Sequence, residues 1–165
     1  GGLRRWLQLG LPTTTDPAPL RPAGDFTARP DAGACADADT TQAAALAPRR
    51  RVLDARAAER YRGEVEPIDP VAGHVPGALN HPSSGVVAAD GLFLPPVELA
   101  SKFSQSLGAV SPVDTITMCG SGVTACHLLL AMEHAGLPGA RLYPGSWSEW
   151  SRDPSRPVAK EGVRG

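Results

Sequence analysis

Residues 115–132 read TITMCGSGVTACHLLLAM, and this stretch decides the fold. Its first four residues, Thr115–Met118, are rich in β-branched side chains, which favour a short strand. Small residues follow, and an apolar run then predicts a helix over 123–135 that ends at Gly136. Strand, tight turn and helix in this order predict one unit of a parallel sheet, with Cys119 at the carboxyl end of the strand.

The same alternation of strand and helix continues on both sides of this unit. Further strands are predicted at Arg51–Asp54, Val75–Leu79 and Arg141–Tyr143. Further helices are predicted at Ala57–Tyr61, Val97–Leu107 and Trp147–Trp150, and a loop or small hairpin is predicted over 83–95. The helix over 97–107 is expected to place Val97, Leu99 and Phe103 on one apolar side. Together these elements predict an α/β fold, a parallel sheet with helices on both faces.

Composition divides the chain into four parts. Residues 1–11 carry apolar side chains at helical spacing, and residues 12–48 are rich in Pro, Ala, Thr and Asp, which predicts a linker. The α/β pattern occupies residues 49–155, and 156–165 are predicted as a C-terminal tail. Cys35 falls in the predicted linker, where we expect an exposed thiol without a function.

The overall composition excludes several classes of function. With 42% hydrophobic residues in 165, the chain has enough apolar material for one core. A net charge of −1 gives no broad basic surface for nucleic acid or anionic membranes, so neither is expected as a partner. No apolar run approaches the roughly 20 residues of a membrane span. Three cysteines, an odd and low count, argue against a disulfide scaffold.

The turn after the central strand has the chemistry of an anion site. Gly120 and Gly122 permit a backbone that turns N–H groups inward, and the following helix adds partial positive charge at its start. Both effects favour a thiolate at Cys119 and are expected to lower its pKa. Ser121 and Thr124 add hydroxyl donors to the same turn.

Four kinds of site compete for this turn. A dithiol redox pair needs closer cysteines than Cys119 and Cys126, and a zinc site needs about four ligands where only His127 is near. A phosphatase loop normally ends in an arginine that grips phosphate, and this loop ends in Val123-Thr124. A single thiolate that carries a group needs only an anion cradle and fits best. No metal and no cofactor are therefore expected.

The segment CGSGVTA resembles the active-site loop of rhodanese-type sulfurtransferases, in the version found in 3-mercaptopyruvate sulfurtransferases. Three more segments resemble family motifs in the same order along the chain: VLDARAAERYRG, GHVPGALNHP and YPGSWSEW. Residues 1–11 resemble the end of the family's first, non-catalytic domain, and GGLRRW at 1–6 aligns with GSWSEW at 145–150. We therefore expect 49–155 to be the catalytic, second domain of a tandem protein.

The resemblance implies a mechanism and a set of site residues. Cys119 would take the sulfane sulfur of a small anionic donor as a persulfide and pass it to cyanide or a thiol acceptor, for example a thioredoxin-like one. The backbone amides of Gly120, Ser121, Gly122, Val123 and Thr124 would stabilise the persulfide. Arg60 matches the family arginine that binds the donor. The family and the cysteine usage imply a cytoplasmic protein.

Two departures from the family pattern bear on the donor. Mercaptopyruvate enzymes usually carry a second arginine in the next loop, where this chain reads EVEPIDPVAGH, with Ile68 and Asp69 at the expected place. Thiosulfate-type loops usually carry basic residues directly after the cysteine, unlike Gly120 and Ser121. The absence of basic residues after the cysteine counts against thiosulfate, and we therefore favour mercaptopyruvate as the donor. Two alternatives remain open: a persulfide-carrying module with little catalysis that serves a partner protein, and a phosphatase on the same scaffold.

Several other residues are interpreted as structural. Cys126 is expected to be a small apolar residue packed between helix and sheet. Asp54 and Arg56 are expected to form an ion pair near the site, and His74 to fix a turn with Pro76-Gly77. The final helix is expected to be anchored by its tryptophans, Trp147 and Trp150.

Overall fold

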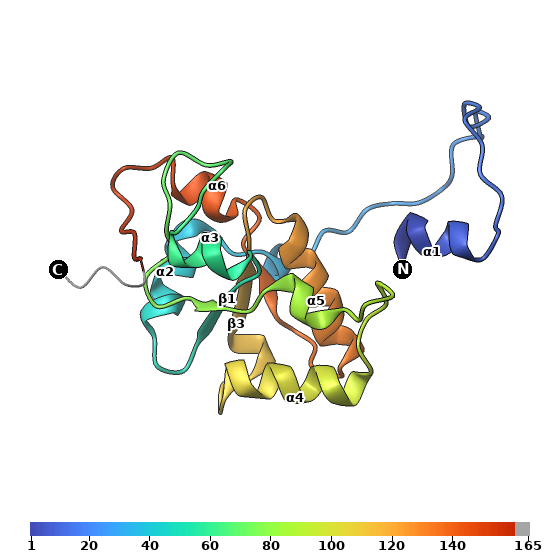
Figure 1. Cartoon of the computed structure of the whole chain (residues 1–165). Coiled ribbons are helices and arrows are strands. Elements are labelled where there is room, and N and C mark those ends of the chain that lie inside the picture. Colours follow the sequence, from blue (N-terminus) through green and yellow to red (C-terminus); the bar gives the residue numbers. More distant parts are fainter. Residues whose placement is uncertain (161–165) are drawn as a thin grey trace.

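A computed structural model of the chain describes residues 1–160 and has a parallel four-stranded sheet at its centre (Figure 1). The strands are β1 (Arg51–Asp54), β2 (Leu79–Asn80), β3 (Thr115–Met118) and β4 (Arg141–Leu142), in the order β2-β1-β3-β4. The predicted α/β fold is confirmed. Strand β2 begins only at Leu79, later than predicted, because Pro76 and Gly77 interrupt the extended backbone before it.

Helices cover both faces of this sheet. Helices α2 (Ala38–Leu46) and α6 (Ser146–Trp150) share one apolar cluster, and α4 (Pro96–Leu107) and α5 (Val123–His134) share the other (Figure 1). The remaining helices are α1 (Gly2–Gln8), α3 (Ala58–Arg62) and the 3-10 turns η1 (Ala32–Ala34), η2 (Ser83–Val86) and η3 (Pro112–Asp114). Because side chains alternate along a strand, Val52 of β1 joins the first cluster and Leu53 the second.

Helix α4 confirms most of its predicted apolar side. Leu99, Phe103 and Leu107 are spaced by four residues and are buried against α5. Val97 was expected on the same side but is 83% exposed, because its place in the first turn points it away from that row. The predicted hairpin over 83–95 is present as an antiparallel bridge between Val87 and Phe93.

Part of the predicted linker is folded onto the sheet. Helix α2 begins after Asp37, whose carboxylate accepts a 2.8 Å bond from the backbone N–H of Thr40. Just before it, Cys35 forms a parallel bridge with Leu142 of β4, and Ala36 N–H donates to the Leu142 carbonyl at 2.7 Å. The folded unit therefore begins well before residue 49, the predicted start.

The two ends of the chain differ in how they contact the folded unit. Helix α1 buries none of its residues and is joined to the folded unit by a long extended segment (Figure 1). The start of the predicted tail does pack, since His74 and Ala159 form an antiparallel bridge. The rest of that tail, 161–165, lies outside the described residues. No helix within residues 1–160 is long and apolar enough to cross a membrane.

Candidate active site

The loop between β3 and α5 turns sharply at Gly122, which caps the helix. Its φ of 81° is in the left-handed region, and a Cβ there would lie 2.8 Å from the carbonyl oxygen of Pro144, so only glycine fits. The backbone N–H groups of residues 120–124 donate to no acceptor within the described part of the chain. They are the unpaired N–H groups of a helix start, free for an anion at Cys119.

The start of α6 holds this loop in place. The backbone N–H of Cys119 donates to Ser146 Oγ at 3.1 Å, and the loop carbonyls of Cys119 and Gly120 accept from the backbone N–H groups of Trp147 and Ser148. Ser146 has a φ of 52°, unusual for a residue with a side chain. The sequence predicts only packing anchors in this helix, so the contact of Ser146 with the cysteine loop is a finding of the structure, although the GSW segment lies within the motif YPGSWSEW.

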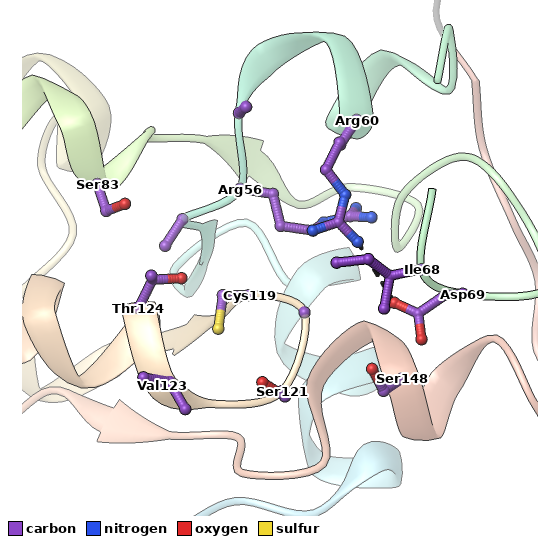
Figure 2. Close-up of a pocket in the computed structure, with 13 residues that line it drawn as sticks. Arg56, Arg60, Ile68, Asp69, Ser83, Cys119, Ser121, Val123, Thr124 and Ser148 are labelled. Atoms are coloured by element: carbon purple, nitrogen blue, oxygen red, sulfur yellow. Dashed lines mark hydrogen bonds and ion pairs between the residues drawn. The ribbon is translucent and has the colours of Figure 1, made fainter. Parts of the chain in front are cut away.

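A cavity of about 300 Å³ opens beside Cys119. Figure 2 shows the Cys119 sulfur within the curve of the loop, with Thr124, Val123 and Ser121 around it. All of the predicted site residues line this cavity except Gly122, which is the N-cap of α5. The lining residues are Ala55, Arg56, Ala57, Arg60, Ile68, Asp69, Ser83, Cys119, Gly120, Ser121, Val123, Thr124 and Ser148.

Arg60 reaches the cavity from α3 and leaves one nitrogen free. Its Nε and Nη2 donate to Glu66 at 3.3 and 2.5 Å, and Nη2 lies 3.4 Å from Asp69 Oδ2. Nη1 has no partner among residues 1–160 and lies above the loop, 3.6 Å from where a Cβ of Gly120 would be. A guanidinium edge therefore faces the space next to Cys119.

Glu66 is the carboxylate that orients this guanidinium. Its side chain is almost fully buried and also accepts bonds from Arg56 Nη1 and from the backbone N–H groups of Ile68 and Asp69, at 3.4, 3.2 and 3.2 Å. Burial alone would raise the pKa of Glu66, but the hydrogen bonds from Arg60 and from two backbone N–H groups hold that pKa below its ordinary value. Sequence reasoning missed Glu66, because one acidic residue in a charged loop gives no pattern.

Asp54 and Arg56 form the predicted ion pair, with Arg56 Nη2 2.7 Å from Asp54 Oδ2 and both side chains buried. The guanidinium of Arg56 also lies 4.6 Å above the ring of Trp147 and donates to the Gly73 carbonyl at 2.8 Å. It is held on every side, so it forms a fixed wall of the cavity. Trp147 and Trp150 are buried packing anchors, as predicted.

One prediction about the helix after the loop is wrong. Cys126 is exposed rather than packed against the sheet. The buried side of α5 runs through Ala125, Leu128 and Met132, and Cys126 is turned about 100° from Ala125 around the helix axis. The ring of His74 does not bond within its own turn: Nδ1–H donates to the Tyr61 carbonyl at 2.8 Å. No cluster of three metal-binding side chains occurs in the described part of the chain.

Comparisons with known proteins agree with this architecture. Residues 37–153 match the rhodanese-like domain model. The chain is 52% identical over 159 residues to a probable 3-mercaptopyruvate sulfurtransferase of Pseudomonas aeruginosa, covering 96% of this chain and 56% of that protein. It is 50% identical over 109 residues to a putative thiosulfate sulfurtransferase of Mycobacterium tuberculosis, covering 66% of this chain and 38% of that protein.

Among solved structures, the anaerobic ergothioneine biosynthesis enzyme of Chlorobium limicola superposes with a TM-score of 0.85 at 22% identity, over 99% of this chain and 40% of that one, a likeness of fold. The chain spans only 38% to 56% of the length of the two sequence relatives. From the matched domain model and the shared sequence, the chain belongs to the rhodanese-like domain family.

Proposed function

We propose that this chain carries the catalytic site of a sulfurtransferase that moves a sulfane sulfur from 3-mercaptopyruvate to cyanide or a thiol, through a persulfide on Cys119. The observation that carries the proposal is the shared cavity of Cys119, the unpaired loop amides and the free Nη1 of Arg60. The names of the two sequence relatives give the same class of reaction.

In the proposed first step, the Cys119 thiolate attacks the sulfur of the donor. The new S–S bond forms as the donor's C–S bond breaks, and the electron pair of that bond leaves as the enolate of pyruvate, which then takes a proton. Arg60 Nη1 binds the donor carboxylate, and the amides of residues 120–124 stabilise negative charge on the sulfurs. In the second step cyanide attacks the outer sulfur of the persulfide. The S–S bond breaks, thiocyanate leaves, and Cys119 is again a thiolate.

The test is thiocyanate formation from cyanide with each donor, 3-mercaptopyruvate and thiosulfate. Cys119→Ser is expected to abolish it, and Cys126→Ser to leave it unchanged, because Cys126 is exposed in the first turn of α5 and does not line the cavity. Mass spectrometry after donor addition should find one extra sulfur on Cys119. Activity that survives in Cys119→Ser would refute the assignment.

A persulfide-carrying module for a partner protein is the second candidate. It is favoured by the apolar mouth of the cavity, where Ile68 and Val123 are each 72% exposed. A small anion does not need such a surface, whereas a docked protein buries it. This candidate predicts that Cys119 loads stoichiometrically with sulfur while turnover with cyanide or small thiols stays slow, and that a thioredoxin-like protein accelerates it.

The tandem arrangement is also proposed, with residues 1–11 as the end of a preceding domain of the same fold. A shared contact supports it: Trp6 Nε1 donates to the Pro12 carbonyl and Trp150 Nε1 to the Pro157 carbonyl, each at 2.9 Å. Trp150 is buried in its domain, while Trp6 is 44% exposed. A longer chain that includes the preceding residues is expected to protect Trp6 from fluorescence quenching by iodide.

A further inference from the structure

We propose that Asp69 makes the cavity selective against sulfur donors that carry two negative charges. The inference rests on the proposed sulfurtransferase function and narrows the donor class of that site to monoanions. Asp69 belongs to the segment EVEPIDPVAGH, which lacks the second arginine that mercaptopyruvate enzymes usually carry. Its side chain places a negative charge where a second positive one was expected.

Asp69 lies in the wall of the same cavity as Cys119. Its side chain is fully buried, and Figure 2 shows its carboxyl group between Arg60 and Ser148. Oδ2 has one long contact, 3.4 Å to Arg60 Nη2, and Oδ1 has no hydrogen-bond partner within residues 1–160. Apart from this contact, no hydrogen-bond donor in the described part of the chain balances the negative charge of Asp69.

The neighbouring carboxylate of Glu66 has many more hydrogen-bond donors than that of Asp69. Glu66 receives five hydrogen bonds, from two arginine side chains and two backbone N–H groups, so its charge is largely balanced. Arg60 in turn is already closest to Glu66, at 2.5 Å. Asp69 shares Arg60 with Glu66 and is the more distant of the two, at 3.4 Å, so its charge is the least balanced in the cluster.

The net charge of this cluster of arginines and carboxylates is also negative. Two arginines, Arg56 and Arg60, face three buried carboxylates, Asp54, Glu66 and Asp69, which leaves one excess negative charge beside the cavity. Inside a protein this charge is screened less than in water. One anionic group of a donor can bind at the free Nη1 of Arg60, but a second charge on the same small molecule meets the field of Asp69.

Thiosulfate and 3-mercaptopyruvate differ in the number of negative charges that they carry. Thiosulfate is a dianion in neutral solution, and its charge is concentrated within a few ångströms of the transferred sulfur. 3-Mercaptopyruvate carries one carboxylate charge and a neutral thiol. Asp69 therefore penalises thiosulfate more than mercaptopyruvate, in binding more than in the chemical step.

The first test removes this charge and keeps the shape. Asp69→Asn is expected to raise kcat/KM for thiosulfate at least tenfold, mainly through KM, and to change kcat/KM for 3-mercaptopyruvate less than threefold. Asp69→Ser should shift the ratio in the same direction. Glu64→Gln is the matched control, because it removes a carboxylate from the same loop outside the cavity. An unchanged ratio in folded Asp69→Asn, or an equal loss with both donors, overturns the proposal.

A second test is independent of sulfur transfer. The alkylation rates of Cys119 by iodoacetate, an anion, and by neutral iodoacetamide are compared in a Cys35→Ser/Cys126→Ser background. Asp69→Asn is expected to raise the iodoacetate-to-iodoacetamide rate ratio several-fold, and Glu64→Gln to leave it unchanged. If neither donor is used but this ratio rises, the sulfurtransferase function fails while the charge selectivity of the cavity stands. A ratio that does not move overturns the selectivity itself.

Discussion

Ser146 Oγ accepts a 3.1 Å hydrogen bond from the backbone N–H of Cys119 and donates a 2.8 Å hydrogen bond to the Tyr143 carbonyl. One buried hydroxyl thus joins the end of β3 to the segment before α6. Ser146→Ala leaves the Cys119 N–H and the Tyr143 carbonyl without this partner, which should lower the free energy of unfolding by about 1–3 kcal/mol. Urea denaturation measures it. Ser148→Ala, in the same helix, removes a hydroxyl without such a role, and an equal loss there would contradict the prediction.

Gly122→Ala should disturb the cysteine loop directly. The left-handed backbone costs an L-residue about 1–2 kcal/mol, and the new Cβ would press on the Pro144 carbonyl oxygen. We expect Gly122→Ala to lower the free energy of unfolding and to slow the alkylation of Cys119 relative to wild type. Gly85→Ala is the control, since a Cβ there has open space and no left-handed backbone. Equal stability of the two variants would show that the loop can relax.

Glu66 should make stability sensitive to acid. Its folded-state pKa is held below the ordinary 4.5, so its contribution is fully present above about that pH and is lost as the pH falls through the lowered value. Glu66→Gln should therefore lose less unfolding free energy than wild type between pH 7 and strongly acidic pH. Glu133→Gln, on the exposed side of α5, is the comparison variant and should follow the wild-type curve.

His81 should add a second pH dependence nearer to neutrality. Burial, and then the charge of Lys102, lower its pKa, and its ring is stacked on Phe103 with the centroids 4.7 Å apart. The folded state favours the neutral ring. Stability from this residue is therefore complete above the unfolded pKa of about 6.5 and falls as the pH drops through the folded value.

The measurement for His81 is the difference in unfolding free energy between pH 7.5 and 5.5. His81→Gln should flatten this difference relative to wild type. His134→Gln, at an exposed position of α5, should leave it as it is. If the two variants behave alike, His81 is not the group that titrates.

The sequence predicts the parts of this fold where local pattern and tertiary position coincide. Thr115–Met118, the small-residue turn and α5 follow from alternation, glycine and apolar run length. Helix α2 was missed because its alanines and threonines resemble a linker, and only the packed sheet gives such small side chains something to bury against. Cys126 was misplaced because a nearly all-apolar helix does not reveal which side faces the sheet.

Within the candidate site, too, the sequence predicts some residues and not others. Cys119 and its loop are visible as a contiguous motif, and Arg60 as part of a second one. Glu66 enters the site only through tertiary contacts with two arginines, at 2.5 and 3.4 Å, which no spacing rule encodes. The orphaned Oδ1 of Asp69 is likewise a property of the folded surroundings.

The bridge between Cys35 and Leu142 has a practical consequence. Strand β4 is the last in the sheet, and Cys35 and Ala36 occupy its otherwise open side, where Arg141 Nη2 also donates to the Cys35 carbonyl at 2.5 Å. An unprotected edge strand recruits other chains into intermolecular sheets. A shortened protein that begins at Arg49 would expose this edge and the apolar patch beneath α2, and should aggregate on concentration. One that begins before Cys35 keeps its edge sealed and should remain monodisperse in light scattering.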